Sequence, residues 1–202
     1  LSTVVSSDLL SEVGYFPGNY SVRYGRALGG LVDLRTRTEI PERSNGHVAV
    51  DVYQATTFVE QVVNKRNAVT FSGRRSYADV VLNPIFTKAG LKVQAPRYYD
   101  FQARWSNKSE AGAWTDVMFL LSDDRFRFLG GSDDEDDVQV GFATTFQKLR
   151  MQHLRDLSED WKLETSVLLG PENVFFEYEG ASEAYEQSEQ LSLRAEVRRE
   201  IS

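Results

Sequence analysis

The fold is predicted by the stretch Trp161-Lys162-Leu163-Glu164-Thr165-Ser166-Val167-Leu168-Leu169, in which apolar and polar residues alternate. Its odd positions carry Trp, Leu, Thr, Val and Leu, whereas positions 162, 164 and 166 carry Lys, Glu and Ser. Successive side chains of a β-strand point to opposite faces of a sheet. The stretch therefore predicts a strand with one apolar and one polar face.

The same alternation recurs after Pro41 and predicts an all-β fold built as an antiparallel meander. Three further segments carry it, namely His47–Val52, Tyr98–Ser106 and Gln190–Arg198. Short turns are expected at Asn45-Gly46, Asn64–Asn67, Ser109–Gly112 and Leu157–Asp160. Longer connections are expected at roughly 83–97, 122–138 and 170–188. Because tight turns and long loops alternate along a meander, all the long loops would lie at one end of the sheet.

Two segments also fit helices. In 146–161 the residues Phe146, Leu149, Leu154 and Leu157 fall near one helical face, and 187–200 is rich in helix-forming Glu, Arg, Leu and Ala. A soluble α+β fold is therefore an alternative. The alternation on both sides of the Leu157–Asp160 turn favours strands instead.

The composition excludes several classes of protein. The chain has 202 residues, a net charge of −7, 41% hydrophobic residues and no cysteine. It can form neither a disulfide framework nor a thiolate metal site, and its 23 Lys and Arg residues argue against a nucleic-acid partner. No apolar run approaches the roughly 20 residues that a membrane helix needs. A transmembrane β-barrel remains compatible, because its strands alternate apolar and polar residues.

No catalytic or cofactor motif is recognisable, so we expect no enzyme, no cofactor and no defined metal site. The two histidines, His47 and His153, lie far apart in sequence, and no nucleophile elbow, P-loop, zinc or dinucleotide pattern is present. One weak calcium candidate is the acidic run Asp133, Asp134, Glu135, Asp136 and Asp137. Because that run lacks the glycine and the spacing of a calcium loop, a solvated charge run is the simpler interpretation.

A glycine-rich segment near the start carries a family resemblance. Residues 16–36 read FPGNYSVRYGRALGGLVDLRT, with Tyr24-Gly25 followed by Gly29-Gly30 and an alternating strand that ends at Thr36. This segment resembles the end of the plug domain in TonB-dependent outer-membrane receptors. A later strand with Gly73-Arg74-Arg75-Ser76-Tyr77 resembles the early barrel strands of such receptors. Gly25, Gly29 and Gly30 would allow the positive φ and the close backbone approach that a tight reversal into a strand requires.

The resemblance implies that residues 1–40 end a plug domain and that residues 41–202 form about eight strands of a larger transmembrane barrel. Plugged transporters of this kind have about 22 strands. The expected strands run roughly over 46–53, 55–63, 67–81, 97–107, 113–129, 138–155, 161–178 and 187–201. The first residues have no signal-peptide pattern, so we expect the sequence to be a segment of a longer protein.

The resemblance also implies a location and partners. The location would be the cell outer membrane. The partners would be its lipid, an unknown extracellular ligand, and the TonB complex through a plug part that precedes this sequence. Specificity would lie in loop detail, so the ligand is not readable.

Candidate plug–barrel contacts are Arg74, Arg75 and Asp33. Arg74 shares its parity with Ser72 and Ser76, so it would face the polar lumen if Val69 and Phe71 face lipid. There it could pair with a plug carboxylate such as Asp33 or meet an anionic ligand.

Aromatic residues near strand ends suggest interfacial girdles. They are Tyr98, Tyr99, Trp105, Trp114, Trp161, Phe175, Phe176 and Tyr178. The three tryptophans border short turns and would mark the periplasmic rim. Two other interpretations stay open: a complete small eight-stranded outer-membrane barrel, and a soluble β-rich binding domain such as a sandwich.

Overall fold

The computed structural model describes residues 5–21, 24, 29–88, 93–129, 138–178 and 182–199. It divides into two compact units, Leu1–Glu39 and Ile40–Ser202. The division falls beside the boundary at residues 40 and 41 that the sequence suggests. The first unit is a small two-stranded sheet, and the second is an eight-stranded sheet.

The first unit pairs two short strands in antiparallel fashion. The 3₁₀ turn η1 (Ser7–Leu9) leads into β1 (Leu10–Phe16), which pairs with β2 (Leu31–Thr36) from Phe16 opposite Leu31 to Leu10 opposite Thr36. Leu9 is buried, and its carbonyl accepts the backbone N–H of Arg37 at 3.0 Å. The pair therefore brings Leu9 and Arg37 together.

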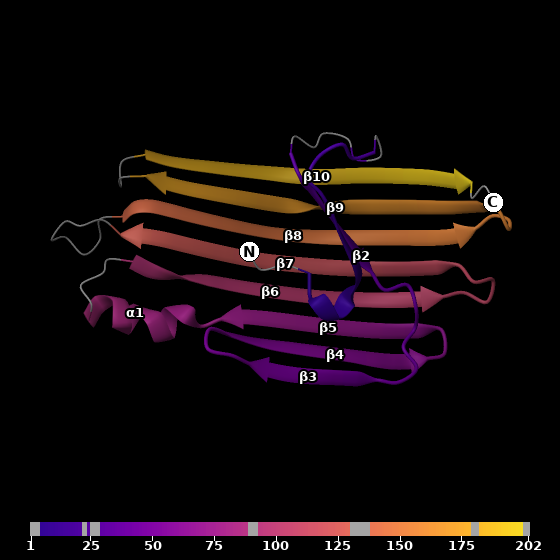
Figure 1. Cartoon of the computed structure of the whole chain (residues 1–202), viewed down its shortest axis with the longest axis horizontal. Coiled ribbons are helices and arrows are strands. Elements are labelled where there is room, and N and C mark those ends of the chain that lie inside the picture. Colours follow the sequence, from indigo (N-terminus) through magenta and orange to yellow (C-terminus); the bar gives the residue numbers. More distant parts are fainter. Residues whose placement is uncertain are drawn as a thin grey trace. The chain divides into compact units, whose positions relative to one another are not determined.

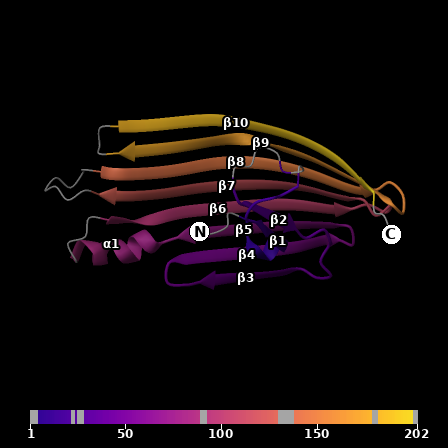
Figure 2. The same cartoon turned by 45° about the horizontal axis from the view of Figure 1, so that its top comes forward.

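The second unit is a meander in which every strand pairs with the next one in sequence (Figure 1). Its strands are β3 (Asn45–Val50), β4 (Gln54–Asn64), β5 (Asn67–Ser76), β6 (Val93–Lys108), β7 (Trp114–Leu129), β8 (Val138–Asp156), β9 (Trp161–Tyr178) and β10 (Ser182–Arg199). The predicted all-β antiparallel meander is thus confirmed. The strands remain side by side when the view is turned by 45° (Figure 2).

Three of the four expected short turns are confirmed, those after β4, β6 and β8, whereas the turn expected at Asn45-Gly46 is wrong because both residues belong to β3. The turns after β4, β6 and β8 lie at one end of the sheet, and α1, which follows β5, lies at the other (Figure 1). The expected long connection at 170–188 is wrong, because β9 reaches Tyr178 and β10 begins at Ser182. Residues 173–178 pair in register with 182–187. A loop was expected because residues 170–188 contain many polar residues together with Gly170, Pro171 and Gly180.

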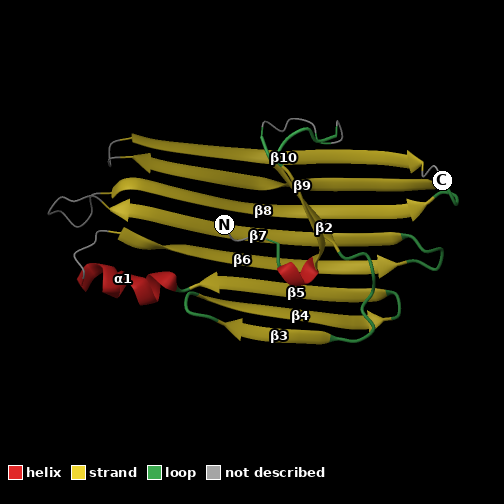
Figure 3. Ribbon diagram, viewed as in Figure 1, coloured by secondary structure: helices red, strands yellow, loops and turns green. Residues whose placement is uncertain are grey.

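A helix replaces part of one predicted strand. The strand expected over 67–81 ends at Ser76, and α1 (Ala78–Lys88) follows, drawn in red in Figure 3. The Ser76 hydroxyl accepts the Ala78 N–H at 3.3 Å, and the Asn83 side-chain oxygen accepts the Ala95 N–H at 2.9 Å. These local bonds fix the helix start and tie it to β6. Among the described residues, no helix is long and apolar enough to cross a membrane.

The two segments that also fit helices form strands. Residues 146–156 belong to β8, residues 157–160 form the turn to β9, and residues 187–199 belong to β10. Their cross-strand pairing overrides the helix propensity of Glu, Arg, Leu and Ala. This is expected, because propensity is a weak preference beside tertiary pairing.

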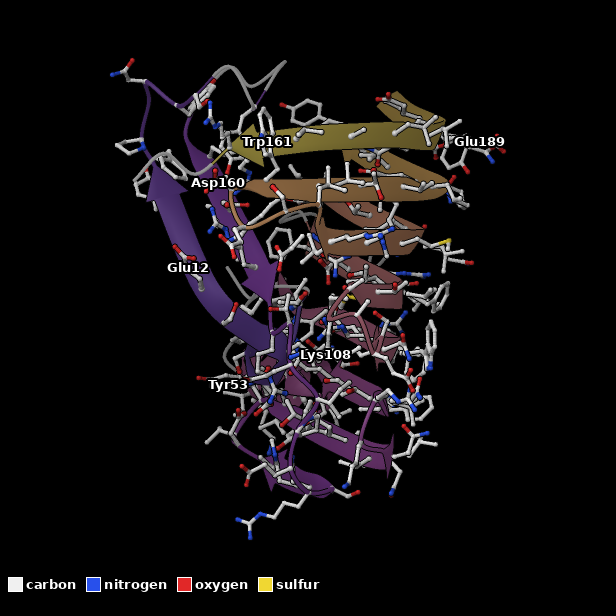
Figure 4. All side chains as sticks on the ribbon, turned by 90° about the vertical axis from the view of Figure 1, so that its right-hand side faces the viewer. Glu12, Tyr53, Lys108, Asp160, Trp161 and Glu189 are labelled. Atoms are coloured by element: carbon white, nitrogen blue, oxygen red, sulfur yellow. The ribbon has the colours of Figure 1, made fainter. Side chains whose placement is uncertain are left out.

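Residues of one parity share one face of the sheet from β4 to β10. Cross-strand partners always have the same parity over the regular part of these pairings, as in Ser72 opposite Gln102 and Phe71 opposite Ala103. We call the face of the odd-numbered residues the apolar face and the face of the even-numbered residues the polar face. Figure 4 views the sheet along its strands, with side chains on both faces.

Two neighbouring rows on the apolar face are entirely apolar across six strands. We call these rows the apolar band. Its members are Val69, Trp105, Val117, Met151, Val167, Leu193, Phe71, Ala103, Phe119, Leu149, Leu169 and Leu191. Several are widely exposed, with Leu191 at 69% and Leu193 at 71%. The polar face instead carries buried Glu60, Asp100, Arg104 and Asp116. The sheet therefore buries charge and exposes apolar surface.

The β8–β9 pairing is interrupted at Gly170-Pro171. Regular pairing stops at Phe146 opposite Glu172 and resumes at Leu149 opposite Leu169. Gly170 has φ of +142°, and a Cβ there would overlap the carbonyl oxygen of Gln147. The Lys148 ammonium donates to the Gly170 carbonyl at 3.3 Å and so satisfies an oxygen at the interruption.

We predict that Gly170→Ala lowers the free energy of unfolding by about 1–3 kcal/mol, because the backbone is strained for any L side chain and lacks room for a Cβ. The matched control is Gly73→Ala in β5, where the nearest atom to a new Cβ is 3.4 Å away. Denaturant titration of both variants measures the difference. An equal response of the two variants would contradict the strain.

Candidate functional site: the polar face of the sheet

A buried carboxylate between two arginines lies on the polar face. Asp116 is 0% exposed, and its Oδ2 accepts Arg150 Nη2 at 2.8 Å. Its Oδ1 accepts the Trp114 indole N–H at 3.2 Å and lies 3.5 Å from Arg104 Nη2. The Arg104 guanidinium also lies over the Trp114 ring, 5.6 Å from its centroid. One negative charge thus holds two cations from the neighbouring strands β6 and β8.

A second charged cluster lies nearer the long connections. Asp100 in β6 accepts Arg74 Nε at 2.8 Å and the Ser122 hydroxyl at 2.9 Å. Arg74 lies over the Tyr98 ring at 4.9 Å, and the Tyr98 hydroxyl donates to the Gln54 side-chain oxygen at 2.7 Å. The cluster therefore links β4, β5, β6 and β7 on one face.

The polar network continues to the last strands. Lys148 forms an ion pair with Glu172 at 3.2 Å, and Gln152 donates to Glu164 at 3.1 Å. Arg198 pairs with Glu164 at 2.6 Å across the β9–β10 hairpin. Polar side chains on this face thus form hydrogen bonds and ion pairs between neighbouring strands from β4 to β10.

The first unit carries its own polar cluster around Asp33. The Tyr24 hydroxyl donates to Asp33 at 2.9 Å, and Arg35 lies 3.2 Å from Asp33 and 3.1 Å from Glu12. The hydrogen bond to Asp33 is the main cause that raises the pKa of Arg35. Tyr24 and Asp33 are therefore tied together within this unit.

Among the remaining predicted residues of the first unit, Gly29 and Gly30 are described. Positive φ is found among the described glycines only at Gly112 and Gly170, so the reversal before β2 does not use it at Gly29 or Gly30. A Cβ on Gly30 would meet the Tyr15 ring at 3.4 Å, an ordinary contact, and one on Gly29 would meet nothing within 4 Å, so the expected close approach is not found at either glycine. Gly25 lies outside the described residues.

Arg74 and Arg75 point to opposite faces. Arg74 lies on the polar face with Ser72 and Ser76, as its parity predicts, and its carboxylate partner within the sheet is Asp100. Arg75 lies on the apolar face, where its guanidinium is 5.4 Å from the centroid of the Tyr99 ring. Their expected contact with Asp33 stays a prediction.

The aromatic residues near strand ends divide between the two faces. Trp105 and Trp161 lie exposed on the apolar face near the short turns. Trp114 is buried on the polar face beside Asp116, so its assignment to an outward-facing girdle is wrong. Tyr98 also lies on the polar face. A position at a strand end did not fix the face, whereas parity did.

The histidines and carboxylates of the described chain form no metal site. His47 stacks on Phe58 at 5.7 Å, and His153 Nδ1 lies 2.8 Å from the Thr115 hydroxyl. Within the described ranges, no three His, Asp or Glu residues are grouped to bind a metal ion. The acidic run Asp133, Asp134, Glu135, Asp136 and Asp137 lies outside those ranges.

A short turn at the α1 end of the sheet is capped by a carboxylate. Asp51 follows β3 and accepts the backbone N–H groups of Tyr53 and Gln54, each at 2.9 Å. These two bonds, led by that from Tyr53, lower the pKa of Asp51. The turn is therefore a closed local structure and offers no free carboxylate base.

Sequence reasoning missed the two central carboxylates of the network, Asp100 and Asp116. Both lie at even positions of alternating strands, so parity alone places them on the polar face. Their arginine partners Arg74 and Arg150 come from neighbouring strands, and the pairings depend on register. Without the strand register, the sequence predicts the face of the sheet on which a side chain lies but not the side chain that it contacts.

In comparisons with known proteins, no protein-family model, no curated protein and no solved structure matches this chain.

We predict that Asp116→Asn lowers the free energy of unfolding by about 3–5 kcal/mol, because it leaves the guanidinium groups of Arg104 and Arg150 without their buried counter-charge. Asp156→Asn, at the exposed end of β8, is the matched control and should change it by less than about 0.5 kcal/mol. Denaturant titration of both variants provides the measurement. Similar losses in both variants would contradict a special role of Asp116.

Proposed function

We propose that this chain is part of a TonB-dependent outer-membrane receptor, comprising the end of its plug domain and the first eight strands of its barrel. The observation that carries the proposal is the distribution of side chains on the sheet, which has the exposed apolar band on one face and buried charges on the other. Hydrocarbon outside and a polar interior are what a transmembrane barrel needs. The resemblance of residues 16–36 to a plug end supplies the family.

The lengths of the strands support the proposal. A barrel strand needs about 9–11 residues to cross a membrane. The strands β6 to β10 have 16, 16, 19, 18 and 18 residues, so each can cross and extend beyond the bilayer. Trp105 within the apolar band and Trp161 outside it both lie on the apolar face near the short turns, where an aromatic girdle would meet the inner interface.

The connections support an orientation. Barrels of bacterial outer membranes have short periplasmic turns and longer extracellular loops. The turns at 65–66, 109–113 and 157–160 would then be periplasmic, and the connection that contains α1 would be extracellular. An extracellular ligand would meet the α1 end of the sheet first.

The free edges of the sheet favour a larger barrel over a small one. Eight strands are enough to close the smallest barrels. However, β3 offers only six residues to the 18 of β10, so direct closure would leave most of the β10 edge unpaired. Unpaired backbone groups are not tolerated in lipid. We therefore propose that further strands lie between β10 and β3.

A soluble sandwich is a weaker candidate. It would need a second sheet packed on the apolar band. The described strands of residues 40–202 form a single sheet, and the band is exposed at Phe71, Leu191 and Leu193.

The proposed mechanism follows the family. Loops and plug would bind a ligand outside the cell, and the TonB complex would act on a plug part that precedes this sequence. The residues of this chain would supply the passive wall and the last plug strands. The charged network on the polar face would line the interior of the barrel.

We predict that the three tryptophans respond differently to lipid. Variants that keep one tryptophan and replace the other two with Phe are placed in micelles that contain brominated phosphatidylcholine. Trp105 and Trp161 should be strongly quenched because they lie on the apolar face, whereas buried Trp114 on the polar face serves as the matched control. Equal quenching of Trp105 and Trp114, or a chain that folds in water without detergent, would contradict the proposal.

The size of the native protein separates a large barrel from a small one. An antibody against residues 113–202 should detect, in an outer-membrane fraction, a band several times larger than 22.9 kDa that shifts on boiling. A shifting band near 22.9 kDa would instead favour a small closed barrel. A signal only in the soluble fraction would contradict both barrel interpretations.

A further inference from the structure

Three arginines gather around one tyrosine on the apolar face, next to the long connections. Arg75 in β5 and Arg97 in β6 lie over the Tyr99 ring, at 5.4 and 5.2 Å from its centroid. Arg125 in β7 is directly opposite Arg97, and Tyr99 is directly opposite both Arg75 and Asp123. We call Arg75, Arg97 and Arg125 the arginine cluster.

The arginine cluster has an excess of positive charge. Asp123 holds Arg125 through bonds of 2.9 and 3.0 Å. Among the described residues, no carboxylate lies within 4.0 Å of Arg75 or Arg97. Like charges directly opposite each other destabilise a strand pair. The pairing of Arg97 with Arg125 therefore carries a cost that an anion between them would offset.

The position of the cluster relative to the apolar band points to the kind of anion. Along β5, Arg75 lies four residues from Phe71, and along β6, Arg97 lies four residues from Phe101. At about 3.3 Å per residue, these distances are roughly 13 Å along the strand. Phe71 and Phe101 are both exposed on the same face as the arginines. Charge and apolar surface are thus arranged as the head and tail of an amphiphile require.

The tyrosine orients the guanidinium groups. Cation–π stacking places an arginine plane against an aromatic ring and keeps the edge of the guanidinium available for hydrogen bonds. Arginine edges bind phosphate oxygens through paired N–H donors. Two stacked arginines and a third on the next strand can therefore surround one phosphate.

We propose that the arginine cluster binds the phosphate of an anionic lipid, whose acyl chains lie along Phe71 and Phe101 on the apolar face. The proposal rests on the proposed function, since it needs the apolar face to contact a bilayer. It differs from the lumenal role expected for Arg75, because it places this residue on the lipid side of the barrel wall. The cluster would fix the depth of the strands at the outer interface.

Spin-label electron paramagnetic resonance tests the proposal. The full chain is reconstituted in phosphatidylcholine bilayers that contain a trace of spin-labelled phosphatidylcholine or spin-labelled phosphatidylglycerol. The wild-type chain should immobilise both labels and prefer phosphatidylglycerol by at least about threefold. Arg75→Gln/Arg97→Gln should abolish the preference and still immobilise phosphatidylcholine.

Two further variants serve as controls. Arg194→Gln/Arg198→Gln removes the same charge from the polar face and should keep the preference. Arg75→Lys/Arg97→Lys retains the charge, and a preserved preference would exclude a folding defect as the cause of the loss.

Each outcome has a separate meaning. If the chain immobilises phosphatidylcholine without any preference for phosphatidylglycerol, the lipid site is wrong and the proposed function stands. A preference that Arg75→Gln/Arg97→Gln leaves unchanged also overturns the site. If neither label is immobilised, the apolar face does not contact lipid and the proposed function itself fails.

Discussion

The structure depends on a register that keeps residues of one parity on one face from β4 to β10. A slip of one residue in any hairpin would transfer every later side chain to the other face. Arg104, Asp116 and Arg150 would then lie on the apolar face, and Val117 and Met151 would lie among charges. The ion pairs of the polar face connect adjacent strands, so each slip would also separate buried charges from their partners. The cost of an unpaired buried charge therefore protects the register.

This constraint gives the polar face a structural task besides any role in binding. Asp116 joins arginines from two neighbouring strands, and Asp100 joins Arg74 of β5 to Ser122 of β7. Each carboxylate lies on a strand between two others and binds a side chain from each of them, so it fixes the alignment of three adjacent strands. The apolar band has no such specificity, since Leu, Val and Met side chains pack interchangeably. Register information is accordingly carried by the charged face.

The sequence predicted the parts of the fold that follow from a period of two. Alternation in Trp161–Leu169 and Gln190–Arg198 was enough to predict strands and their faces, and the parity of Arg74 was confirmed. Two other features depend on interactions that alternation does not contain. The helix after Ser76 begins where the Ser76 hydroxyl accepts the Ala78 N–H. It is tied to β6 by the Asn83 side-chain oxygen, which accepts the Ala95 N–H. The extension of β9 and β10 depends on the pairing of residues 173–178 with 182–187. The charge network was missed for the same reason, because its partners are adjacent only after the strands pair.

A second pattern is the order of residue types along one face of a strand, from one end of the strand to the other. On the apolar face of β6, the order from the short-turn end is Trp105, Ala103, Phe101, Tyr99 and Arg97. This order runs from an aromatic residue through an apolar stretch to an aromatic and a charged residue. Under the proposed function it would follow the change of polarity from one interface of a bilayer to the other. A soluble sheet has no reason to grade one face in this direction, because its packed core is apolar throughout and its edges are wet on every side. The graded face and the alternating strand together distinguish the two faces of the sheet and the two ends of its strands.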